Sequence, residues 1–189
     1  MRSSGSHPSE PGAVRAFLAA ALQDATRARL DRLSSGWRFP GVRLVPSANA
    51  HVTLRFLGQA TAAQLERVAA LVAPVAAACP AAIATASGLA VFPPRGAPRV
   101  LALALALPAG VTALQQACEA AARDAGFAPE PREFHPHLTL GRWSRRGPRP
   151  PLPTLEPFAV PLDRVVLYRS DAGPAGVTYP ALATFPLAG

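Results

Sequence analysis

The stretch "HPHLTLGR", residues 135–142, decides how this chain is interpreted, because its pattern occurs a second time as "HVTLRFLG" at residues 51–58. Each copy reads histidine, apolar residue, threonine, leucine, and each reaches a glycine within a few residues. The chain contains only four histidines, so two of them at matching places in a repeated pattern are informative. One His-x-Thr in a strand is most often a structural edge position, whereas the pair favours a shared function.

The same order of elements precedes each copy. Residues 14–20 ("VRAFLAA") are strand-like, and a helical pattern of apolar residues follows over 22–33. Residues 100–106 ("VLALALA") are also strand-like, and a second helical pattern covers 111–121, with Gly126 as the expected C-terminal cap. Both halves therefore predict strand, helix and then the motif strand.

The spacing between these elements is also repeated. Val14 precedes His51 by 37 positions, Val100 precedes His137 by 37 positions, and the two copies are therefore offset by 86. A constant offset of this kind predicts an internal duplication and two related lobes.

The rest of the chain lacks a steady β-α-β-α alternation. A helix begins at Thr61, where "TAAQ" has the form of a capping box, and Pro74 is expected to kink or end it. Strands are expected near 81–91 and 164–170, and the basic, proline-rich segment 144–153 is expected to be a surface loop. This order predicts an α+β fold.

The expected architecture is bilobal, with two related lobes whose mainly antiparallel sheets face a central cleft. The helices are expected on the outer faces, and a pseudo-two-fold axis relates the lobes. One such domain is predicted over residues 13–189, and the polar segment 1–12, which includes His7, is predicted to be a disordered tail.

The composition favours an anionic partner. Apolar residues make up 50% of the chain and charged residues 16%, which is enough material for a core. The net charge of +8 comes from 19 basic residues, all of them arginine, and points above all to nucleic acid. The apolar run 100–111 is too short to span a bilayer, and Cys79 and Cys118 are expected to be buried thiols. We expect a cytoplasmic, monomeric protein without membrane association.

Strand alternation gives each motif one polar face. Two sets are expected on opposite faces of the first motif strand, namely His51, Thr53 and Arg55 on the cleft side and Val52, Leu54 and Phe56 in the core. His137 and Thr139 share a face in the same way, so each motif offers an imidazole and a hydroxyl about 7 Å apart.

Two imidazoles and two hydroxyls in one cleft suit in-line attack at phosphorus. A neutral histidine can take a proton from a water nucleophile while a protonated histidine gives one to the leaving oxygen. The threonine hydroxyls can donate to the non-bridging phosphate oxygens.

Other chemistries match the sequence less well. His135 and His137 could begin a zinc site, but no cysteine or carboxylate follows at ligand spacing. The sequence contains no GxSxG elbow, Walker A loop or GxGxxG fingerprint. A noncatalytic module that binds nucleotides or RNA ends remains the alternative to an enzyme, and His135 is expected at the rim of the cleft.

The two motifs resemble those of the 2H phosphoesterase superfamily, in particular the RNA 2′,3′-cyclic phosphodiesterases once called 2′-5′ RNA ligases. The resemblance covers about residues 13–187. It includes the opening "VRAFLAA", the central "GLAVFPPRGAPRVLALAL" and the closing "VVLYRSDAGPAGVTYPALATFPL". It implies metal-independent hydrolysis of RNA or nucleoside 2′,3′-cyclic phosphate ends to 2′-phosphates, together with reversible 2′-5′ RNA ligation. No cofactor is implied. Another cyclic phosphate or a 2′-5′-linked oligonucleotide is the alternative substrate.

The resemblance also implies residue roles. His51 would be the proton donor to O3′ and His137 the proton acceptor. Thr53 and Thr139 would hold the phosphate, and Arg142 would bind it as well.

Strand alternation and the resemblance disagree about Arg142. Alternation places Arg142 opposite His137, whereas the resemblance directs it at the phosphate. A β-bulge or a strand end at Gly141 would reconcile the two. Strand alternation places Arg55 on the cleft side, so Arg55 is the alternative phosphate contact.

Overall fold

A computed structural model of the protein describes residues 12–144, 147–174 and 176–189. The predicted tail lies outside the described residues except for Gly12, and so does His7. The elements in chain order are β1 (Val14–Ala21), α1 (Asp24–Ser34), β2 (Val42–Leu44), the 3₁₀ turn η1 (Ser47–Asn49), β3 (His51–Ala60), α2 (Ala62–Ala78), β4 (Ala82–Phe92), β5 (Val100–Ala106), α3 (Ala109–Asp124), β6 (His137–Trp143), β7 (Phe158–Leu162), β8 (Arg164–Arg169), β9 (Asp171–Gly173), β10 (Gly176–Thr178) and β11 (Ala181–Pro186).

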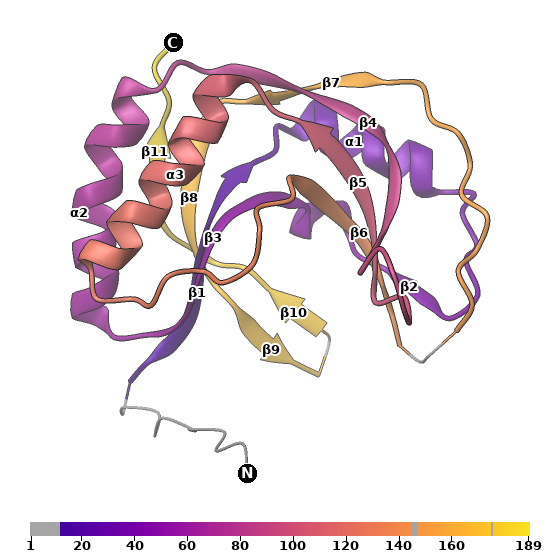
Figure 1. The fold of residues 1–189 in the computed structure, drawn as a ribbon, viewed down its shortest axis with the longest axis horizontal. Helices are drawn as coiled ribbons and strands as arrows, with labels where there is room; N and C mark the ends of the chain where they lie inside the picture. Colours follow the sequence, from indigo (N-terminus) through magenta and orange to yellow (C-terminus); the bar gives the residue numbers. More distant parts are fainter. Residues whose placement is uncertain (1–11, 145–146, 175) are drawn as a thin grey trace.

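The predicted α+β fold with antiparallel strands and two lobes is confirmed, and the two lobes share one curled sheet (Figure 1). The strand order is β11-β8-β1-β3-β6-β5-β4-β7, with β2 added to β6, and β9 and β10 form a separate hairpin. The lobes meet where β3 pairs with β6 through Val52 and Leu138. Both side chains have no exposed surface, so the junction is part of the core.

The pseudo-two-fold axis passes between Val52 and Leu138, which hold the same place in the two motifs. The predicted constant offset does not extend to the preceding strands. Ala20 pairs with Val52 in the first lobe, and Leu103 pairs with Leu138 in the second. The offset between equivalent positions of β1 and β5 is therefore three residues shorter than the offset between the two histidines. The helices and loops between the strands differ in length, and connecting segments tolerate such differences.

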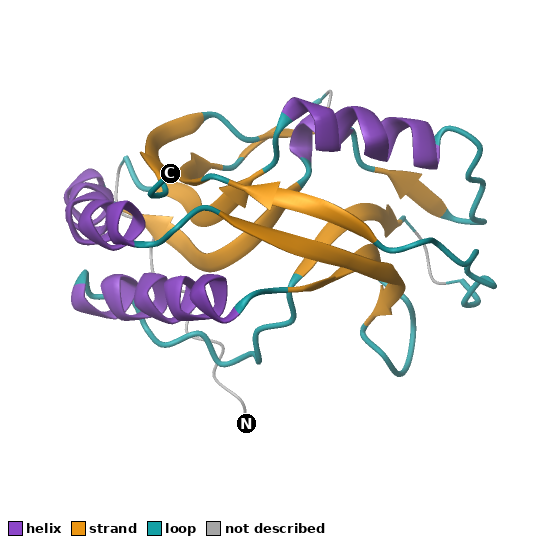
Figure 2. Ribbon diagram, turned by 90° about the horizontal axis from the view of Figure 1, so that it is seen from above, coloured by secondary structure: helices purple, strands orange, loops and turns teal. Residues whose placement is uncertain are grey.

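The helices cover the sheet at its two ends (Figures 1 and 2). α2 and α3 pack together, with α3 against β3 and α2 against β8 and β11. α1 lies at the other lobe, where Arg29 stacks on the ring of Phe158 at 4.1 Å from its centroid. α1 follows β1 of the first lobe but covers the second lobe, and α3 follows β5 of the second lobe but covers the first. Each of these two helices therefore covers the lobe opposite to the strand before it.

Local sequence signals account for most helix ends. The Thr61 hydroxyl accepts from the Gln64 amide at 3.3 Å, and the Gln64 side chain accepts from the Thr61 amide at 3.0 Å, which confirms the capping box. Gly126 has φ +89° directly after α3, as a C-terminal glycine cap requires. Pro74 does not end α2, which continues to Ala78. Cys118 is buried as expected, whereas Cys79 is only partly buried.

In the described part of the chain, no helix has both the length and the apolar character needed to cross a membrane.

Candidate active site

The β3–β6 junction brings the two motifs together. Because the strands are antiparallel and Val52 faces Leu138, His51 lies across from Thr139, and Thr53 lies across from His137. All four polar side chains are on the face opposite the buried junction pair, and the two histidines are diagonal neighbours about 7–8 Å apart along the sheet. The structure thus assembles the four predicted residues into one cluster.

Each histidine is held through the same hydrogen bond. The Nδ1 atom of His51 donates to the carbonyl of Asn49 at 2.8 Å, and that of His137 donates to the carbonyl of His135 at 2.6 Å. A carbonyl can only accept, so the proton stays on Nδ1 and Nε2 becomes the atom that gains or loses a proton. Both rings therefore present Nε2 for chemistry.

Aromatic rings surround His51. The centroids of Phe17, Tyr179 and Tyr168 lie 4.7, 5.1 and 6.0 Å from the imidazole centroid. Around His137 the described residues include one such neighbour, Phe92 at 5.1 Å. The two histidines thus occupy unequal environments, although their motifs are equivalent.

Burial and nearby positive charge keep both histidines neutral. Burial lowers the pKa of His51 to about 4, and the positive charges of Arg27 and Arg142 and of a protonated His137 act in the same direction. The pKa of His137 is also lowered, first by burial and then by Arg142 and His135. In each case the bond to the backbone carbonyl partly opposes the shift. Before substrate binds, both shifts therefore favour the neutral imidazole.

A β-bulge brings Arg142 to the cleft face. Thr139 pairs with Ala102 and Gly141 pairs with Leu101, so Leu140 is an extra residue that reverses the alternation. Arg142 is exposed on the same side as His137, and of the two alternatives at Gly141, a bulge or a strand end, the structure shows the bulge, since β6 continues to Trp143. The position needs glycine because a Cβ there would lie 2.6 Å from Cγ1 of Val42.

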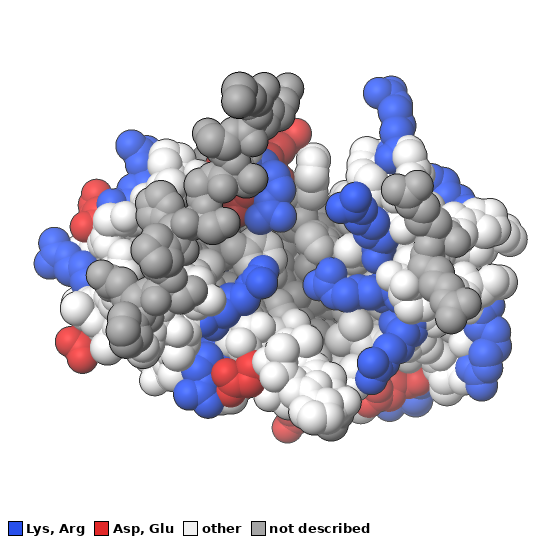
Figure 3. Space-filling view, turned by 90° about the horizontal axis from the view of Figure 1, so that it is seen from below, with Lys and Arg blue, Asp and Glu red and all other residues white. Residues whose placement is uncertain are grey.

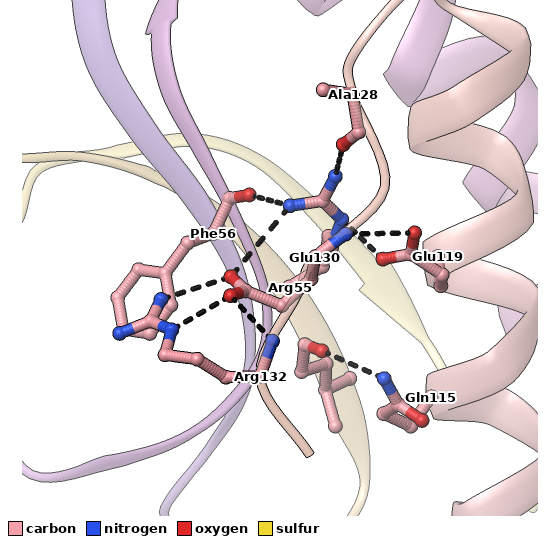
Figure 4. A network of polar contacts seen from close by, with 8 residues as sticks. Arg55, Phe56, Gln115, Glu119, Ala128, Glu130 and Arg132 are labelled. Atoms are coloured by element: carbon pink, nitrogen blue, oxygen red, sulfur yellow. Dashed lines mark hydrogen bonds and ion pairs between the residues drawn. The ribbon is translucent and has the colours of Figure 1, made fainter. Parts of the chain in front are cut away.

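The first motif has the same bulge, and here the predicted orientations were wrong. Thr53 pairs with Ala19 and Arg55 pairs with Leu18, so Leu54 is the extra residue. Arg55 consequently points to the helix side and is 5% exposed, whereas Phe56, expected in the core, is 43% exposed. Gln115 of α3 donates to the freed carbonyl of Leu54 at 3.3 Å (Figure 4).

Arg55 is engaged in a buried network instead of facing the cleft (Figure 4). Its Nε lies 2.5 Å from Glu119, its Nη1 lies 3.9 Å from Glu130, and it donates to the carbonyls of Phe56 and Ala128. These contacts occupy the guanidinium, so the expectation that Arg55 rivals Arg142 as a phosphate contact is corrected. The repeat itself carried the signal, because equivalent strands should share the bulge expected at Gly141.

Sequence reasoning missed two residues that support the first histidine. Arg27 of α1 donates to the carbonyls of Ser47 and Ala48 at 2.8 and 2.7 Å and so fastens the turn before β3. Asn49, whose carbonyl holds His51, uses its side chain to donate to Val177 of β10 at 2.8 Å. Asn49 stands two positions before the histidine and could have been noticed, but nothing local marks Arg27.

The cleft is basic. Figure 3 shows arginine side chains on both sides of a central hollow. Arg43 of β2 is paired with Arg142 in the β2–β6 register, and both are exposed. Among the described residues, no group of three or more histidine, cysteine, aspartate or glutamate side chains is placed to hold a metal ion. His135 is 58% exposed and 3.7 Å from Glu133, which agrees with the expected rim position.

This fold and the paired motifs define the 2′-5′ RNA ligase superfamily, which residues 19–174 match, and the chain belongs to that superfamily. A Thermus thermophilus protein named RNA 2′,3′-cyclic phosphodiesterase is 34% identical over 194 residues, covering 93% of this chain and 91% of that protein. A protein of the same name from Methanothermobacter thermautotrophicus is 30% identical and covers 92% and 99%.

Solved structures show the same fold. A crystal structure of a Thermus thermophilus protein has a TM-score of 0.82 and 30% identity and covers 93% of this chain and 98% of that chain. E. coli LigT in complex with 3′-AMP has a TM-score of 0.77 and 25% identity, with 94% and 99% covered. The resemblance found in the sequence is thereby confirmed.

Proposed function

We propose that this protein is an RNA 2′,3′-cyclic phosphodiesterase, which opens a terminal ribose 2′,3′-cyclic phosphate to a 2′-phosphate. The observation that carries the proposal is the matched pair of histidines, each with Nδ1 bonded to a carbonyl and Nε2 left for proton transfer. A module that only binds RNA ends would need neither an acid nor a base. The names of the curated relatives support the substrate class.

The proposed reaction is an in-line displacement at phosphorus. Nε2 of His137 takes a proton from water as the oxygen–phosphorus bond forms, and Nε2 of His51 gives a proton to O3′ as the P–O3′ bond breaks. The products are a 3′-hydroxyl and a 2′-phosphate. His51 is regenerated when the two histidines exchange protons with solvent.

Hydroxyl and guanidinium groups would hold the phosphate during this step. Thr53 and Thr139 donate to the non-bridging oxygens, whose charge persists through the transition state. Arg142 supplies a cation on the same face because of the bulge. Arg55 has no part in the proposal, since its ion pair with Glu119 directs it away from the cleft.

The low pKa of His51 requires the substrate to assist protonation. In the free protein, burial favours the neutral ring, and so do the positive charges of Arg27 and Arg142. A bound phosphodiester places a negative charge beside both imidazoles and raises both pKa values. Substrate binding therefore favours the acid form of His51, which the free protein disfavours at neutral pH.

The test is product analysis with protein kept in excess EDTA. Adenosine 2′,3′-cyclic phosphate and a short RNA with a cyclic phosphate end are incubated with the protein, and the phosphate isomer is identified by ³¹P NMR. We expect the 2′-phosphate only, with activity unaffected by the chelator. A 3′-phosphate product would contradict the assignment of O3′ as leaving group, and binding without turnover would favour the noncatalytic alternative. Addition of an RNA with a free 5′-hydroxyl tests for the reverse, ligating reaction.

A further inference from the structure

We propose that Phe56 and Arg132 form a stacking platform for the base of the nucleotide next to the reacting end of the RNA. The inference rests on the proposed function, because it concerns how the same cleft distinguishes an RNA strand from a mononucleotide. Neither residue belongs to the repeated His-x-Thr pattern, and neither was expected at the cleft.

Phe56 is an exposed aromatic ring on the catalytic face of β3. The bulge at Leu54 turns it to the same side as His51 and Thr53, and 43% of its surface is accessible. Its centroid lies 6.1 Å from that of Phe17, which in turn lies 4.7 Å from the His51 imidazole. Phe17 thus lies between Phe56 and His51, and Phe56 lies outside the cluster of histidines and threonines.

Arg132 places a planar cation over this ring, so that the outer face of the guanidinium continues the stack. Its guanidinium carbon is 5.3 Å from the Phe56 centroid, and its side chain is 68% exposed (Figure 4). The guanidinium donates two hydrogen bonds to the Glu130 carboxylate, from Nε to Oε1 at 2.7 Å and from Nη2 to Oε2 at 2.9 Å. The plane is therefore oriented before any ligand arrives, which lowers the entropic cost of binding.

The buried network around Arg55 fixes the position of the Glu130–Arg132 pair. Glu119 accepts from the main-chain amide of Glu130 at 3.2 Å while its other oxygen contacts Arg55 at 2.5 Å. Arg55 also approaches Glu130 at 3.9 Å and bonds the Ala128 carbonyl. The loop that carries Arg132 is thereby tied to the strand that carries His51. The network therefore runs from the buried Arg55–Glu119 pair to the exposed guanidinium of Arg132 and the ring of Phe56.

A nucleobase matches this surface chemically. Bases stack on arginine planes and on aromatic rings whatever their sequence, and each such contact contributes a measurable share of binding to single-stranded nucleic acid. A mononucleotide that fills the catalytic cluster would leave the platform empty. A strand with one more nucleotide would occupy it, so the platform would favour RNA ends over free cyclic nucleotides.

The test compares two product-like probes by isothermal titration calorimetry, adenosine 2′-monophosphate and the dinucleotide ApA with a terminal 2′-phosphate. We expect the wild type to bind the dinucleotide on the order of tenfold more tightly. The affinity ratio should fall toward one in Phe56→Ala and Arg132→Ala. Arg132→Lys keeps the charge but lacks the plane and should lose most of the ratio. Arg67→Ala, which removes an exposed arginine of α2 away from the cleft, should retain it.

The outcomes separate this inference from the proposed function. Equal wild-type affinity for the two probes overturns the platform even if cyclic phosphates are hydrolysed. The protein could instead prefer the dinucleotide through Phe56 and Arg132 but hydrolyse neither adenosine 2′,3′-cyclic phosphate nor the RNA with a cyclic phosphate end. That result supports the platform and contradicts the proposed enzymatic function. If Arg132→Lys binds the dinucleotide as the wild type does, attraction of the additional phosphate explains the preference and stacking is wrong.

Discussion

Thr53 on β3 lies directly across from His137 on β6, so the nearest threonine of each histidine belongs to the other copy of the motif. Cross-strand neighbours have Cβ atoms about 4.5–5.5 Å apart, closer than the two residues of one motif along their own strand. Neither lobe therefore contains a complete site. Each lobe supplies one residue to each of two cross-strand pairs, His51 with Thr139 and His137 with Thr53.

The crossed pairing predicts how threonine variants behave. Thr53→Ala and Thr139→Ala should each lower kcat by up to about 10²-fold, since one oxyanion donor is lost while others remain. Thr→Ser at either position should restore most of the rate because it keeps the hydroxyl. Steady-state kinetics on a dinucleotide with a 2′,3′-cyclic phosphate end provides the measurement. Wild-type rates in both alanine variants would place phosphate binding elsewhere.

Loss of either histidine ring should abolish turnover. His51→Ala and His137→Ala each remove a proton-transfer group worth about 10²–10⁴-fold, and the fold should persist in circular dichroism spectra because both rings face the cleft. His135→Ala is the matched control, since it keeps the carbonyl that accepts from His137 and removes only a rim side chain. Activity near the wild-type level in either catalytic variant would end the two-histidine mechanism.

The dependence of kcat/KM on pH should be bell-shaped, with its maximum below pH 6.5. This parameter reports the free enzyme, in which the pKa of His51 is lowered to about 4 and that of His137 is lowered as well. As pH rises through these values, the pair loses the single proton that the reaction needs. The two limbs belong to the coupled pair and to neither histidine alone.

The maximum of kcat should lie at higher pH, because the bound phosphate raises both pKa values in the complex. Rates measured from pH 4 to pH 9 at low and at saturating substrate separate the two profiles. A kcat/KM that stays constant up to pH 8 would show that no imidazolium is needed.

Arg142 should affect both phosphate binding and the pH profile. Its charge lowers the pKa of both histidines, so Arg142→Gln should move the kcat/KM maximum to higher pH while reducing its height. Arg142→Lys should keep the position of the maximum and part of the activity. Arg67→Gln on α2 serves as the charge-matched control. An unmoved maximum in Arg142→Gln would mean that the guanidinium lies farther from the histidines than the bulge places it.

Arg55 should matter for stability and not for phosphate. Arg55→Met leaves the Glu119 carboxylate, which is 23% exposed, without its ion-pair partner, and the loss of unfolding free energy should lie below the ~3–5 kcal/mol that breaking a fully buried pair costs. The double variant Arg55→Met/Glu119→Leu should recover most of this loss, because no unpaired charge remains. Urea unfolding gives the free energies, and inhibition by inorganic phosphate gives the second measurement. A stable Arg55→Met protein with weakened phosphate inhibition would restore Arg55 as a phosphate contact.

Local signals in the sequence were sufficient for the long strands, the helices and the central residues, but not for the short strands β2, β9 and β10 or for β7. The repeat of His-x-Thr identified all four polar side chains of the cluster, since strand alternation places residues i and i+2 on one face. The capping box at Thr61 and the glycine at position 126 marked helix ends, because these depend on contacts within a few residues.

Only the tertiary structure decided where the neighbouring side chains point and how the histidines titrate. The bulges at Leu54 and Leu140 arise from the register with β1 and β5, and one extra residue reverses the side chains that directly follow it. That reversal sends Arg55 into the α3 network and brings Phe56 and Arg142 to the cleft. The low pKa of His51 likewise comes from burial and from Arg27 and Arg142. Packing and long-range charge depend on which strands become neighbours, and the sequence pattern along one strand does not contain that information.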